Sequence, residues 1–490
     1  MQKDKSFFDK YISGLTALVC AGALFFHSGL DVCAASKTEL ALEANRALPI
    51  QSNEVANWPT GPVVGAESAI LMELETGAIL YEKNIHMQEY PASTTKILTT
   101  LIASEQCSMD EIVTFSHDAV FDTPRDSSHI AMDVGQELTM EQCLNAILIR
   151  SANEVSFAVA EHITGTTDWS VFAEIMNQRA AELGCINSHF ANPNGLPDEN
   201  HYTTAYDLAM IGRAFFSNEM LCKITLTRRM EFPVTDKLPK GKLEVNLMQI
   251  IPGGTYAYEY LVGCKTGYTD SARSCLVSCA EKDGMKLICV VMKDESPHQY
   301  EDTIALFNYG FNNFDKVNVS QAETKYNIDN TGLFYSGNDI FGNSQPILSL
   351  NRNDYVILPK TTSFNELDSV ISYDTQNENQ AAIITYTYHD VYIGSVSLNF
   401  AVDQEDTSSL FNTPEEEIPK SRNSSFIFIN IIKVLGILVA IGVIGVLFFL
   451  VRLLLKNFSF AGHGRRVWKK ENRRRRKKAK RANRFRDFDF

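Results

Sequence analysis

The sequence predicts an α/β protein in which an antiparallel sheet is flanked by a helical cluster, followed by a small all-β domain and one transmembrane helix. Three observations support this fold class. Extended apolar runs occur at both ends of residues 61–315, with helical periodicity between them. Short alternating segments then occupy residues 316–403. A long uncharged stretch follows within residues 426–455.

Length and composition limit the classes of protein to consider. The chain has 490 residues, of which 45% are hydrophobic and 21% are charged, an ordinary globular composition. This composition excludes a disordered chain, a collagen-like chain and a small disulfide-stapled scaffold. Domains of about 100 to 200 residues predict roughly two to four units in a chain of this length.

The net charge of −14 is unevenly distributed along the chain. From Arg452 to the end there are 16 lysines and arginines against 3 acidic residues, whereas the rest of the chain has 29 against 56. The charge is therefore not spread along one face as in a nucleic-acid-binding enzyme, and no nucleic acid is expected as a partner of the acidic body. An acidic body and a basic tail indicate two parts in two environments.

The N-terminus has the order of a secretory signal peptide. Three lysines precede an apolar run at residues 15–26, and small residues follow at 33–36. An apolar run of this length is too short to cross a bilayer comfortably. We expect residues 1–35 to be a cleaved signal peptide and residues 36–60 to be a polar N-terminal segment. An uncleaved anchor is the alternative.

A second apolar run predicts a membrane span at residues 426–455. Val434–Val451 contains 18 residues without a charge, about 27 Å as a helix, which is close to the hydrocarbon thickness. The basic tail at 456–490 follows directly, and because positive charge stays cytoplasmic, the acidic body is expected outside. Residues 404–425, rich in Glu, Ser, Asn and Pro, are expected to be a solvated linker. A buried core helix before a solvated tail is the alternative.

The ten cysteines are not spaced as a disulfide framework or as a metal site. Cys20 and Cys33 fall in the expected signal peptide. Cys275 and Cys279 stand in an apolar run where a strand would separate them by roughly 13 Å, too far for a disulfide. Paired CxxC and HExxH spacings do not occur in the sequence. We expect small buried thiols, no metal and no cofactor.

Extended segments are expected at both ends of residues 61–315. Ser68–Leu74 and Ala78–Glu82 are predicted as one pair of strands, and Leu276–Ala280 and Leu287–Met292 as another. Because helices separate the two pairs, we expect one sheet whose strands come from distant parts of the chain.

Helix start signals occur between these strands. Thr139 with Gln142 matches a capping box ahead of apolar residues at helical spacing. Thr204 with Asp207 repeats the signal, with Asp in place of Glu. We therefore expect helices to begin after both threonines.

Residues 316–403 change in pattern. Short alternating segments such as Ile383–Tyr388 are separated by Asn, Asp and Gly. This pattern predicts a separate small β-rich domain between the larger domain and the linker.

Ser93 and Lys96 are the first candidates for chemistry. If Ser93 opens the helix that continues through Ile97 and Leu98, Lys96 lies one turn further and about 300° round, so hydroxyl and amine project from the same face. A buried lysine with a lowered pKa can accept the hydroxyl proton. The helix N-terminus also favours negative charge near the serine. An N-cap serine beside a surface lysine is the alternative.

Two further motifs could complete a site. Ser151 and Asn153 follow a predicted helix and could relay a proton and hold a substrate amide, or form only a turn. Lys265 would supply a second cation and Thr266 a hydroxyl for a substrate carboxylate. Gly267 would let a substrate backbone lie close to the strand. The alternative for this motif is a lysine before a turn.

The order of the three motifs carries a family resemblance. SxxK at 93–96, SxN at 151–153 and KTG at 265–267 are similar to the motif set of penicillin-recognising serine acyl transferases. Over roughly residues 60–310 the chain resembles the D-alanyl-D-alanine carboxypeptidases, which are low-molecular-mass penicillin-binding proteins. The similar stretches are residues 82–99, 151–154, 192–196, 201–208 and 263–269. The resemblance implies a β-lactamase/transpeptidase-like fold for residues 61–315.

The resemblance also implies a reaction. The protein would be a serine-type hydrolase that removes the terminal D-alanine from peptidoglycan pentapeptide stems through an acyl-enzyme. Ser93 would be the nucleophile, Lys96 the general base and Ser151 the group that passes a proton to the departing amine. β-Lactams would be covalent inhibitors because they present a similar acyl group.

Substrate binding is assigned by the same resemblance. Asn153 would hold the substrate and Lys96, while Lys265 and Thr266 would bind the terminal carboxylate beside Gly267. The backbone N–H groups of Ser93 and Tyr268 would form the oxyanion hole.

Two departures from the family pattern affect these expectations. Lys293, His298 and Gln299 stand where relatives often place an arginine for the substrate carboxylate, so the strength of carboxylate binding is open. Glu154 replaces a more usual aspartate.

Other functions are compatible with the same sequence. A β-lactamase would need an efficient deacylating carboxylate, and a catalytically weak wall-binding protein would use the β domain to recruit partners. The expected location is a bacterial cell membrane, with a single pass, an extracellular catalytic domain and a cytoplasmic C-terminus. The basic tail is expected to contact anionic lipid, with a cytoplasmic protein or nucleic acid as the alternative.

Overall fold

The computed structural model describes residues 36–323 and 348–400, except positions 233, 235, 237, 239, 376 and 378. The chain divides after Asp403 into two compact units, and all described residues belong to the first. The expected signal peptide, linker, membrane span and basic tail lie outside the described residues.

Helices and strands follow one another through the larger region. In chain order they are α2 Lys37–Arg46, η1 Gln51–Glu54, β1 Ser68–Glu73, β2 Ile79–Lys83, η2 Ala92–Thr95, α3 Lys96–Gln106, β3 Ile112–Thr114, α4 His117–Phe121, β4 Glu137–Thr139, α5 Met140–Arg150, α6 Asn153–Thr164, α7 Trp169–Glu182, α8 Ala205–Phe216, α9 Glu219–Leu226, β5 Arg229–Phe232, β6 Lys242–Val245, β7 Leu261–Thr269, β8 Arg273–Lys282, β9 Met285–Asp294 and α10 His298–Asn313.

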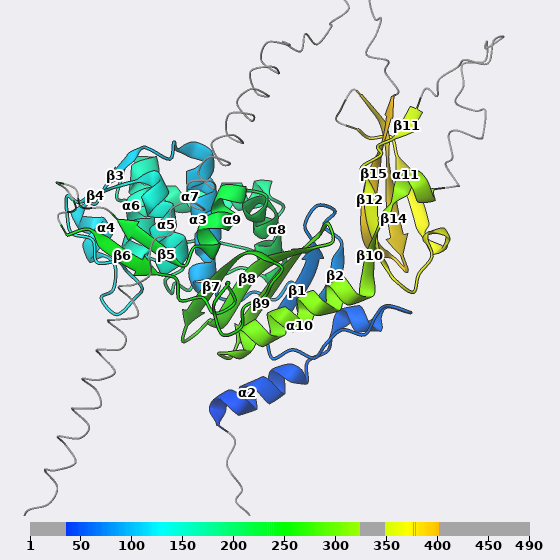
Figure 1. Cartoon of the computed structure of the whole chain (residues 1–490), viewed down its shortest axis with the longest axis horizontal. Helices are drawn as coiled ribbons and strands as arrows, with labels where there is room; N and C mark the ends of the chain where they lie inside the picture. Colours follow the sequence, from blue (N-terminus) through cyan, green and yellow to red (C-terminus); the bar gives the residue numbers. More distant parts are fainter. Residues whose placement is uncertain are drawn as a thin grey trace, which may run out of the picture. The chain divides into compact units, whose positions relative to one another are not determined.

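Five antiparallel strands form the central sheet, in the order β2-β1-β9-β8-β7 (Figure 1). The pairing of β1 with β9 runs from Ser68 opposite Met292 to Glu73 opposite Leu287. The prediction of one sheet built from distant parts of the chain is therefore confirmed. The β8–β9 hairpin turns at Asp283 and Gly284 with φ of 52° and 76°, the positive values that a tight two-residue hairpin requires.

The sheet is buried on both faces. In β9, Ile288 and Val290 belong to the hydrophobic core shared with the helical cluster, whereas Leu287 and Cys289 belong to the core shared with α10. This alternation follows from the period of two along a strand. α10 thus covers one face and the helical cluster covers the other (Figure 1).

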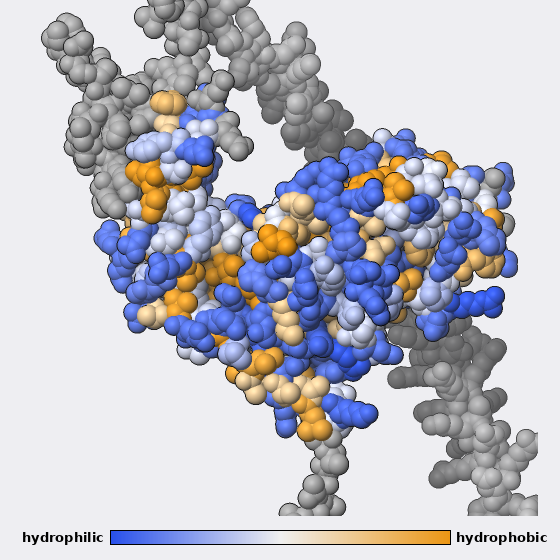
Figure 2. All heavy atoms as spheres, turned by 180° about the vertical axis from the view of Figure 1, so that it is seen from behind, coloured by the Kyte–Doolittle hydropathy of each residue, from blue (hydrophilic) through white to orange (hydrophobic). Residues whose placement is uncertain are grey.

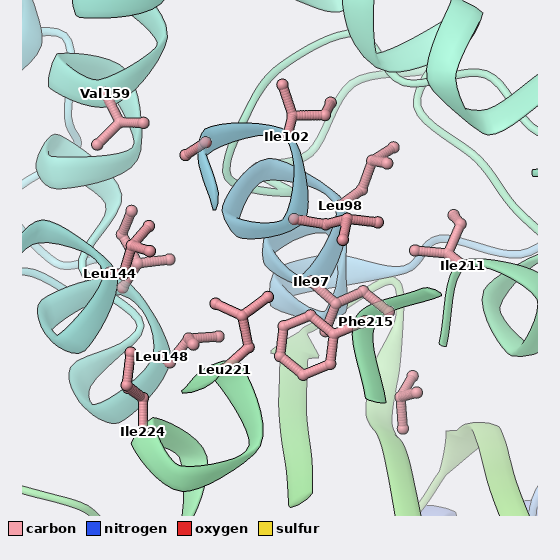
Figure 3. Close-up of a cluster of buried hydrophobic side chains, with 14 of the residues drawn as sticks. Ile97, Leu98, Ile102, Leu144, Leu148, Val159, Ile211, Phe215, Leu221 and Ile224 are labelled. Atoms are coloured by element: carbon pink, nitrogen blue, oxygen red, sulfur yellow. The ribbon is translucent and has the colours of Figure 1, made fainter. Parts of the chain in front are cut away.

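Helix α3 lies at the centre of the helical cluster. Its residues Ile97, Leu98 and Ile102 are fully buried. Side chains of four other helices surround them in Figure 3, namely Leu144 and Leu148 of α5, Val159 of α6, Ile211 and Phe215 of α8, and Leu221 and Ile224 of α9. The segment that begins with the predicted SxxK motif is therefore held from several sides.

Both predicted helix starts are confirmed. Thr139 and Gln142 form a complete capping box at the start of α5. The Thr204 hydroxyl accepts the backbone N–H of Asp207 at 3.0 Å, which caps α8. All eight cysteines of the described ranges are free, and six of them are buried as expected, whereas Cys107 and Cys185 are partly exposed.

The C-terminal described part consists mainly of strands. They are β10 Phe314–Asn318, β11 Leu348–Leu350, β12 Tyr355–Pro359, β13 Asp368–Ser372, β14 Gln380–Tyr388 and β15 Val391–Phe400, with short helices α11 Val319–Ala322 and η3 Phe364–Glu366. β10 pairs with β12, and the other four strands form a sheet in the order β11-β15-β14-β13. α10 leads directly into β10, which spans the domain boundary expected at residue 316, so this boundary stays a prediction.

This β-rich part is tied to the central sheet by polar as well as apolar contacts. The Tyr355 hydroxyl lies 2.9 Å from Glu73 Oε1 and 2.7 Å from Glu75 Oε2. Ile384 belongs to the same hydrophobic core as Leu287 of β9. The described residues therefore share a core across the two parts.

The visible surface is mostly hydrophilic. Figure 2 shows apolar residues in small separate groups among polar ones. Within the described ranges, no helix combines the length and the apolar character needed to cross a bilayer.

We expect the core around α3 to dominate stability. Replacing Phe215 by alanine removes a fully buried ring and should lower the free energy of unfolding by about 3–5 kcal/mol. Replacing Ile186, which is 67% exposed, by alanine should change it by less than about 0.5 kcal/mol. Urea unfolding followed by circular dichroism measures both values, and equal losses would contradict this assignment of the core.

Candidate active site

Ser93 lies on a turn that is fixed by its neighbours. It belongs to the 3₁₀ helix η2, which runs into α3, so the serine precedes the α-helix by one short turn and does not open it. Ala92 has a φ of 49°, an uncommon value for a residue with a Cβ. The hydroxyls of Thr94 and Thr95 donate to the carbonyls of Pro91 and Ala92 at 2.7 and 2.8 Å. These bonds hold Ser93 in place.

Lys96 is fully buried directly beneath Ser93. Its Nζ lies 2.9 Å from Ser93 Oγ, 2.7 Å from Asn153 Oδ1 and 2.7 Å from the Asn194 carbonyl oxygen. A neutral amine has two N–H groups and one lone pair. If the two N–H groups donate to the carbonyl oxygens of Asn153 and Asn194, the lone pair is left for the Ser93 hydroxyl.

The surroundings favour the neutral amine. Burial lowers the pKa of Lys96 well below its ordinary value, and the nearby Lys265 lowers it further. The Glu154 carboxyl acts in the opposite direction and raises this pKa. The dominant effect is burial, so Lys96 is suited to accept a proton from Ser93.

Ser151 and Lys265 face each other across the site. Ser151 follows the last residue of α5 in the left-handed conformation, with φ of 58°. Lys265, on β7, places Nζ 3.2 Å from Ser151 Oγ and 2.7 Å from the Thr266 carbonyl oxygen. Burial lowers the pKa of Lys265 to about 8. A hydroxyl within hydrogen-bond distance of such an amine is placed to exchange a proton with it.

Asn153 connects the base to a neighbouring loop. It is the first residue of α6, and its side-chain Nδ2 donates to Ser127 Oγ at 2.9 Å while Oδ1 faces Lys96. Its backbone N–H donates to the Ser128 carbonyl at 2.9 Å. No sequence pattern pointed to these loop serines, because the loop has neither periodicity nor a motif.

A cavity of about 520 Å³ brings the predicted residues together. Seven of the eight predicted site residues line it, namely Ser93, Ser151, Asn153, Lys265, Thr266, Gly267 and Tyr268. Lys96, the eighth, lies under the cavity floor and reaches it through its contact with Ser93 Oγ.

Gly267 allows β7 to approach the Ser93 turn. A Cβ on this glycine would lie 2.8 Å from the Pro91 carbonyl oxygen and 3.0 Å from the Ser93 nitrogen. The KTG motif predicts that the glycine makes room for a substrate backbone. Packing within the protein already requires a glycine here, whatever lies in the cavity.

The loop that contains Gly195 packs against the Ser93 turn. Gly195 has a φ of 80°, and a Cβ there would lie 1.8 Å from the Ala92 carbonyl oxygen. His201 accepts the Ala191 N–H at Nδ1, so its Nε2 carries the proton and donates to Thr95 Oγ1 at 2.9 Å. Burial lowers the pKa of His201 to about 4, which keeps the ring neutral. The family resemblance includes the stretches that hold these residues, but it does not indicate the contacts.

The side chains expected near the substrate carboxylate are largely engaged elsewhere. Lys293 pairs with Glu67 at 2.7 Å, and His298 lies 2.9 Å from Glu301. Of these three side chains, Gln299 lines the cavity, whereas Lys293 and His298 do not.

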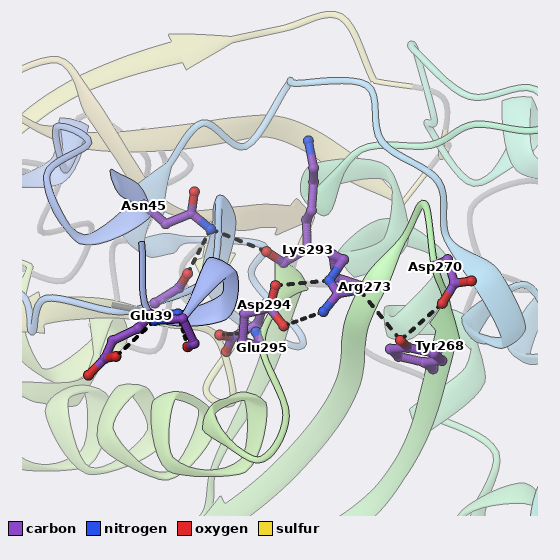
Figure 4. Close-up of polar contacts among 10 residues, drawn as sticks. Glu39, Asn45, Tyr268, Asp270, Arg273, Lys293, Asp294 and Glu295 are labelled. Atoms are coloured by element: carbon purple, nitrogen blue, oxygen red, sulfur yellow. Dashed lines mark hydrogen bonds and ion pairs between the residues drawn. The ribbon is translucent and has the colours of Figure 1, made fainter. Parts of the chain in front are cut away.

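Arg273 is also committed to a carboxylate. Its Nε and one terminal nitrogen lie 2.9 and 2.6 Å from the two carboxylate oxygens of Glu295 (Figure 4). Its guanidinium lies 5.8 Å from the centre of the Tyr268 ring, and the Tyr268 hydroxyl donates to Asp270 at 3.2 Å. The Arg273–Glu295 ion pair joins the start of β8 to the residue that follows β9. The buried cation that faces Ser151 is therefore Lys265.

Comparison with known proteins agrees with this geometry. The family model of the D-alanyl-D-alanine carboxypeptidases, peptidase family S11, matches residues 55–296. The D-alanyl-D-alanine carboxypeptidase DacF of Bacillus subtilis is 34% identical over 272 residues, covering 53% of this chain and 67% of DacF. DacB2 of Mycobacterium tuberculosis, with the same enzyme name, is 30% identical over 259 residues, covering 52% of this chain and 84% of DacB2.

A solved structure shows the same fold over a longer stretch. Penicillin binding protein 5 of Haemophilus influenzae superposes with a TM-score of 0.55 at 25% identity, covering 70% of this chain and 98% of that protein. The fold is therefore the penicillin-binding, transpeptidase-like α/β fold with an antiparallel sheet and helices. On the family match and these relatives together, the chain belongs to the D-alanyl-D-alanine carboxypeptidases, a family of serine peptidases.

Proposed function

We propose that this protein removes the terminal D-alanine from peptidoglycan pentapeptide stems through an acyl-enzyme on Ser93. The observation that carries the proposal is the buried Lys96 amine, 2.9 Å from the Ser93 hydroxyl and 2.7 Å from each of two carbonyl oxygens. An amine in this setting is a base ready to activate the serine.

The first step forms the acyl-enzyme. Ser93 Oγ attacks the carbonyl carbon between the two terminal D-alanines, and its proton moves to Lys96 Nζ. The negative charge on the carbonyl oxygen is stabilised by the backbone N–H groups of Ser93 and Tyr268, each worth on the order of 3 kcal/mol. The close approach of β7 to the Ser93 turn at Gly267 supports this pairing of donors.

The leaving group then takes up a proton. Ser151 donates its hydroxyl proton to the departing amine as the C–N bond breaks, and it recovers a proton from Lys96. Lys265, 3.2 Å from Ser151 Oγ, favours this transfer. Lys265 and the Thr266 hydroxyl bind the carboxylate of the departing D-alanine.

Hydrolysis completes the cycle. Water gives a proton to Lys96 and attacks the Ser93 ester, and the shortened stem leaves with a new carboxylate while Ser93 recovers its proton. A β-lactam would acylate Ser93 in the same way, because its strained amide presents a similar carbonyl group.

Labelling with a fluorescent penicillin tests the nucleophile. Ser93→Ala should abolish covalent label, because no other group takes over the attack. Ser104→Ala, in the helix α3 that follows the Ser93 turn but near its far end, should label like the unchanged protein. A Ser93→Ala protein that labels as strongly as the unchanged protein would overturn the proposal.

Product analysis separates the alternative functions. The carboxypeptidase should release D-alanine from a pentapeptide stem faster than it turns over penicillin, as measured by a D-alanine assay and by loss of β-lactam absorbance. Faster penicillin turnover would indicate a β-lactamase. Labelling without D-alanine release would indicate a wall-binding protein.

The pH dependence of acylation tests the role of Lys96. The rate falls as pH falls through the Lys96 pKa, because only the neutral amine accepts a proton. Lys265→Gln removes a cation that lowers this pKa, so the acidic limb should move up by about one pH unit. Glu154→Gln removes a carboxylate that raises this pKa, so the limb should move down. The label formed per unit time against pH gives both limbs, and limbs that stay in place would exclude Lys96 as the base.

We also propose that the protein is held in a bacterial cell membrane by residues 426–455, with the catalytic part outside. The uncharged run at 434–451 and the basic tail after it support this location.

Cell fractionation tests the membrane location. The full chain should stay with membranes after a high-salt wash, because salt screens contacts between charges and leaves apolar burial intact. A chain that ends at residue 425 should leave the membrane fraction. Retention of the shortened chain on washed membranes would contradict the assignment.

A further inference from the structure

Three potential metal ligands meet away from the cavity. Cys107 follows the last residue of α3, His162 lies near the end of α6, and Glu111 comes from the loop between α3 and β3. Lys96 and Asn153 are the first residues of the same two helices. The cluster therefore lies at the opposite ends of the helices that position the base.

The ligand atoms are close enough to share one ion. One atom from each of Cys107, Glu111 and His162 lies within 4.8 Å of the other two. His162 Nε2 is 2.8 Å from Glu111 Oε2. The other carboxylate oxygen of Glu111 accepts the Ser108 N–H at 2.6 Å, which fixes the orientation of the carboxylate.

The cluster is accessible and chemically mixed. The side chains of His162 and Glu111 are 24% and 42% exposed, so an ion can reach them from solvent. A thiolate, an imidazole and a carboxylate are the donors that Zn²⁺ prefers, at about 2.0–2.3 Å from the metal. Donors at such distances in a tetrahedral site stand roughly 3–4 Å apart, so small side-chain movements suffice.

We propose that Cys107, Glu111 and His162 form a binding site for a divalent transition-metal cation of the Zn²⁺ class, with water as a fourth ligand. The bound ion links the end of α3, the following loop and α6. This proposal is independent of the reaction proposed for Ser93.

Binding has to displace a proton from the thiol. Burial, together with Glu111, raises the pKa of Cys107, so the free thiol holds its proton at neutral pH. The metal replaces this proton, as metals do when they bind cysteine in other sites. The sequence does not reveal the site, because His162 is distant in sequence from Cys107 and Glu111 and the three match none of the usual Cys and His spacings.

Cobalt(II) provides a direct spectroscopic test on the full chain under reducing conditions. We expect one equivalent of Co²⁺ to bind and to produce thiolate-to-metal charge-transfer absorbance. Cys107→Ser should lose this absorbance, whereas Cys185→Ser, which changes another partly buried cysteine, should keep it. The absence of absorbance, or its survival in Cys107→Ser, would overturn the proposal.

Zinc binding by equilibrium dialysis gives a second measurement. His162→Gln should weaken Zn²⁺ binding at least about tenfold, because even the loss of a group that only orients a ligand costs about that much. Circular dichroism without metal checks that each variant is folded. Equal Zn²⁺ binding by folded His162→Gln and unchanged protein would exclude His162 as a ligand and overturn the site.

Discussion

The burial of one amine is the constraint on which the site depends. Lys96 has no exposure to solvent, and the partners of its Nζ are the Ser93 hydroxyl and the carbonyl oxygens of Asn153 and Asn194. A buried ammonium would require far stronger compensation than two neutral carbonyl groups supply. Burial therefore favours the neutral form of the Lys96 amine, and α3 lies in the middle of the helical cluster that buries it.

Local backbone conformations serve this arrangement. Ala92, next to the nucleophile, and Ser151, the second serine, both adopt positive φ values of 49° and 58°. Such conformations cost of order 1–3 kcal/mol each and persist only where surrounding contacts enforce them. The threonine hydroxyls at 94 and 95 and the loop of Gly195 provide those contacts for the first turn. The end of α5 and the start of α6 provide them for the second.

Features that depend on side-chain identity and local order were predictable from the sequence. The capping box at Thr139 and the strand pairs that join in one sheet were predicted because each has its own pattern. Seven of the residues that line the cavity were predicted as well, since three motifs in one order point to one site. Their catalytic roles remain proposals.

Contacts made by the backbone or by distant segments were not predictable in this way. Any residue supplies a carbonyl oxygen, so nothing in the type of Asn194 announces its contact with Lys96. The need for glycine at position 195 comes from the Ala92 oxygen, which is distant in sequence. These features follow from tertiary packing, which single-sequence patterns do not encode.

The order of strands has a consequence for how the chain acquires its structure. β9, the third strand of five in the sheet, pairs with β1 from Ser68 opposite Met292. The hairpin of β1 and β2 emerges early from the ribosome but has no neighbour until almost the whole catalytic region has been synthesised. Closing so long a loop makes sheet assembly late and slow relative to helix formation. Throughout that interval the edge of β1 that later pairs with β9 lacks its partner strand.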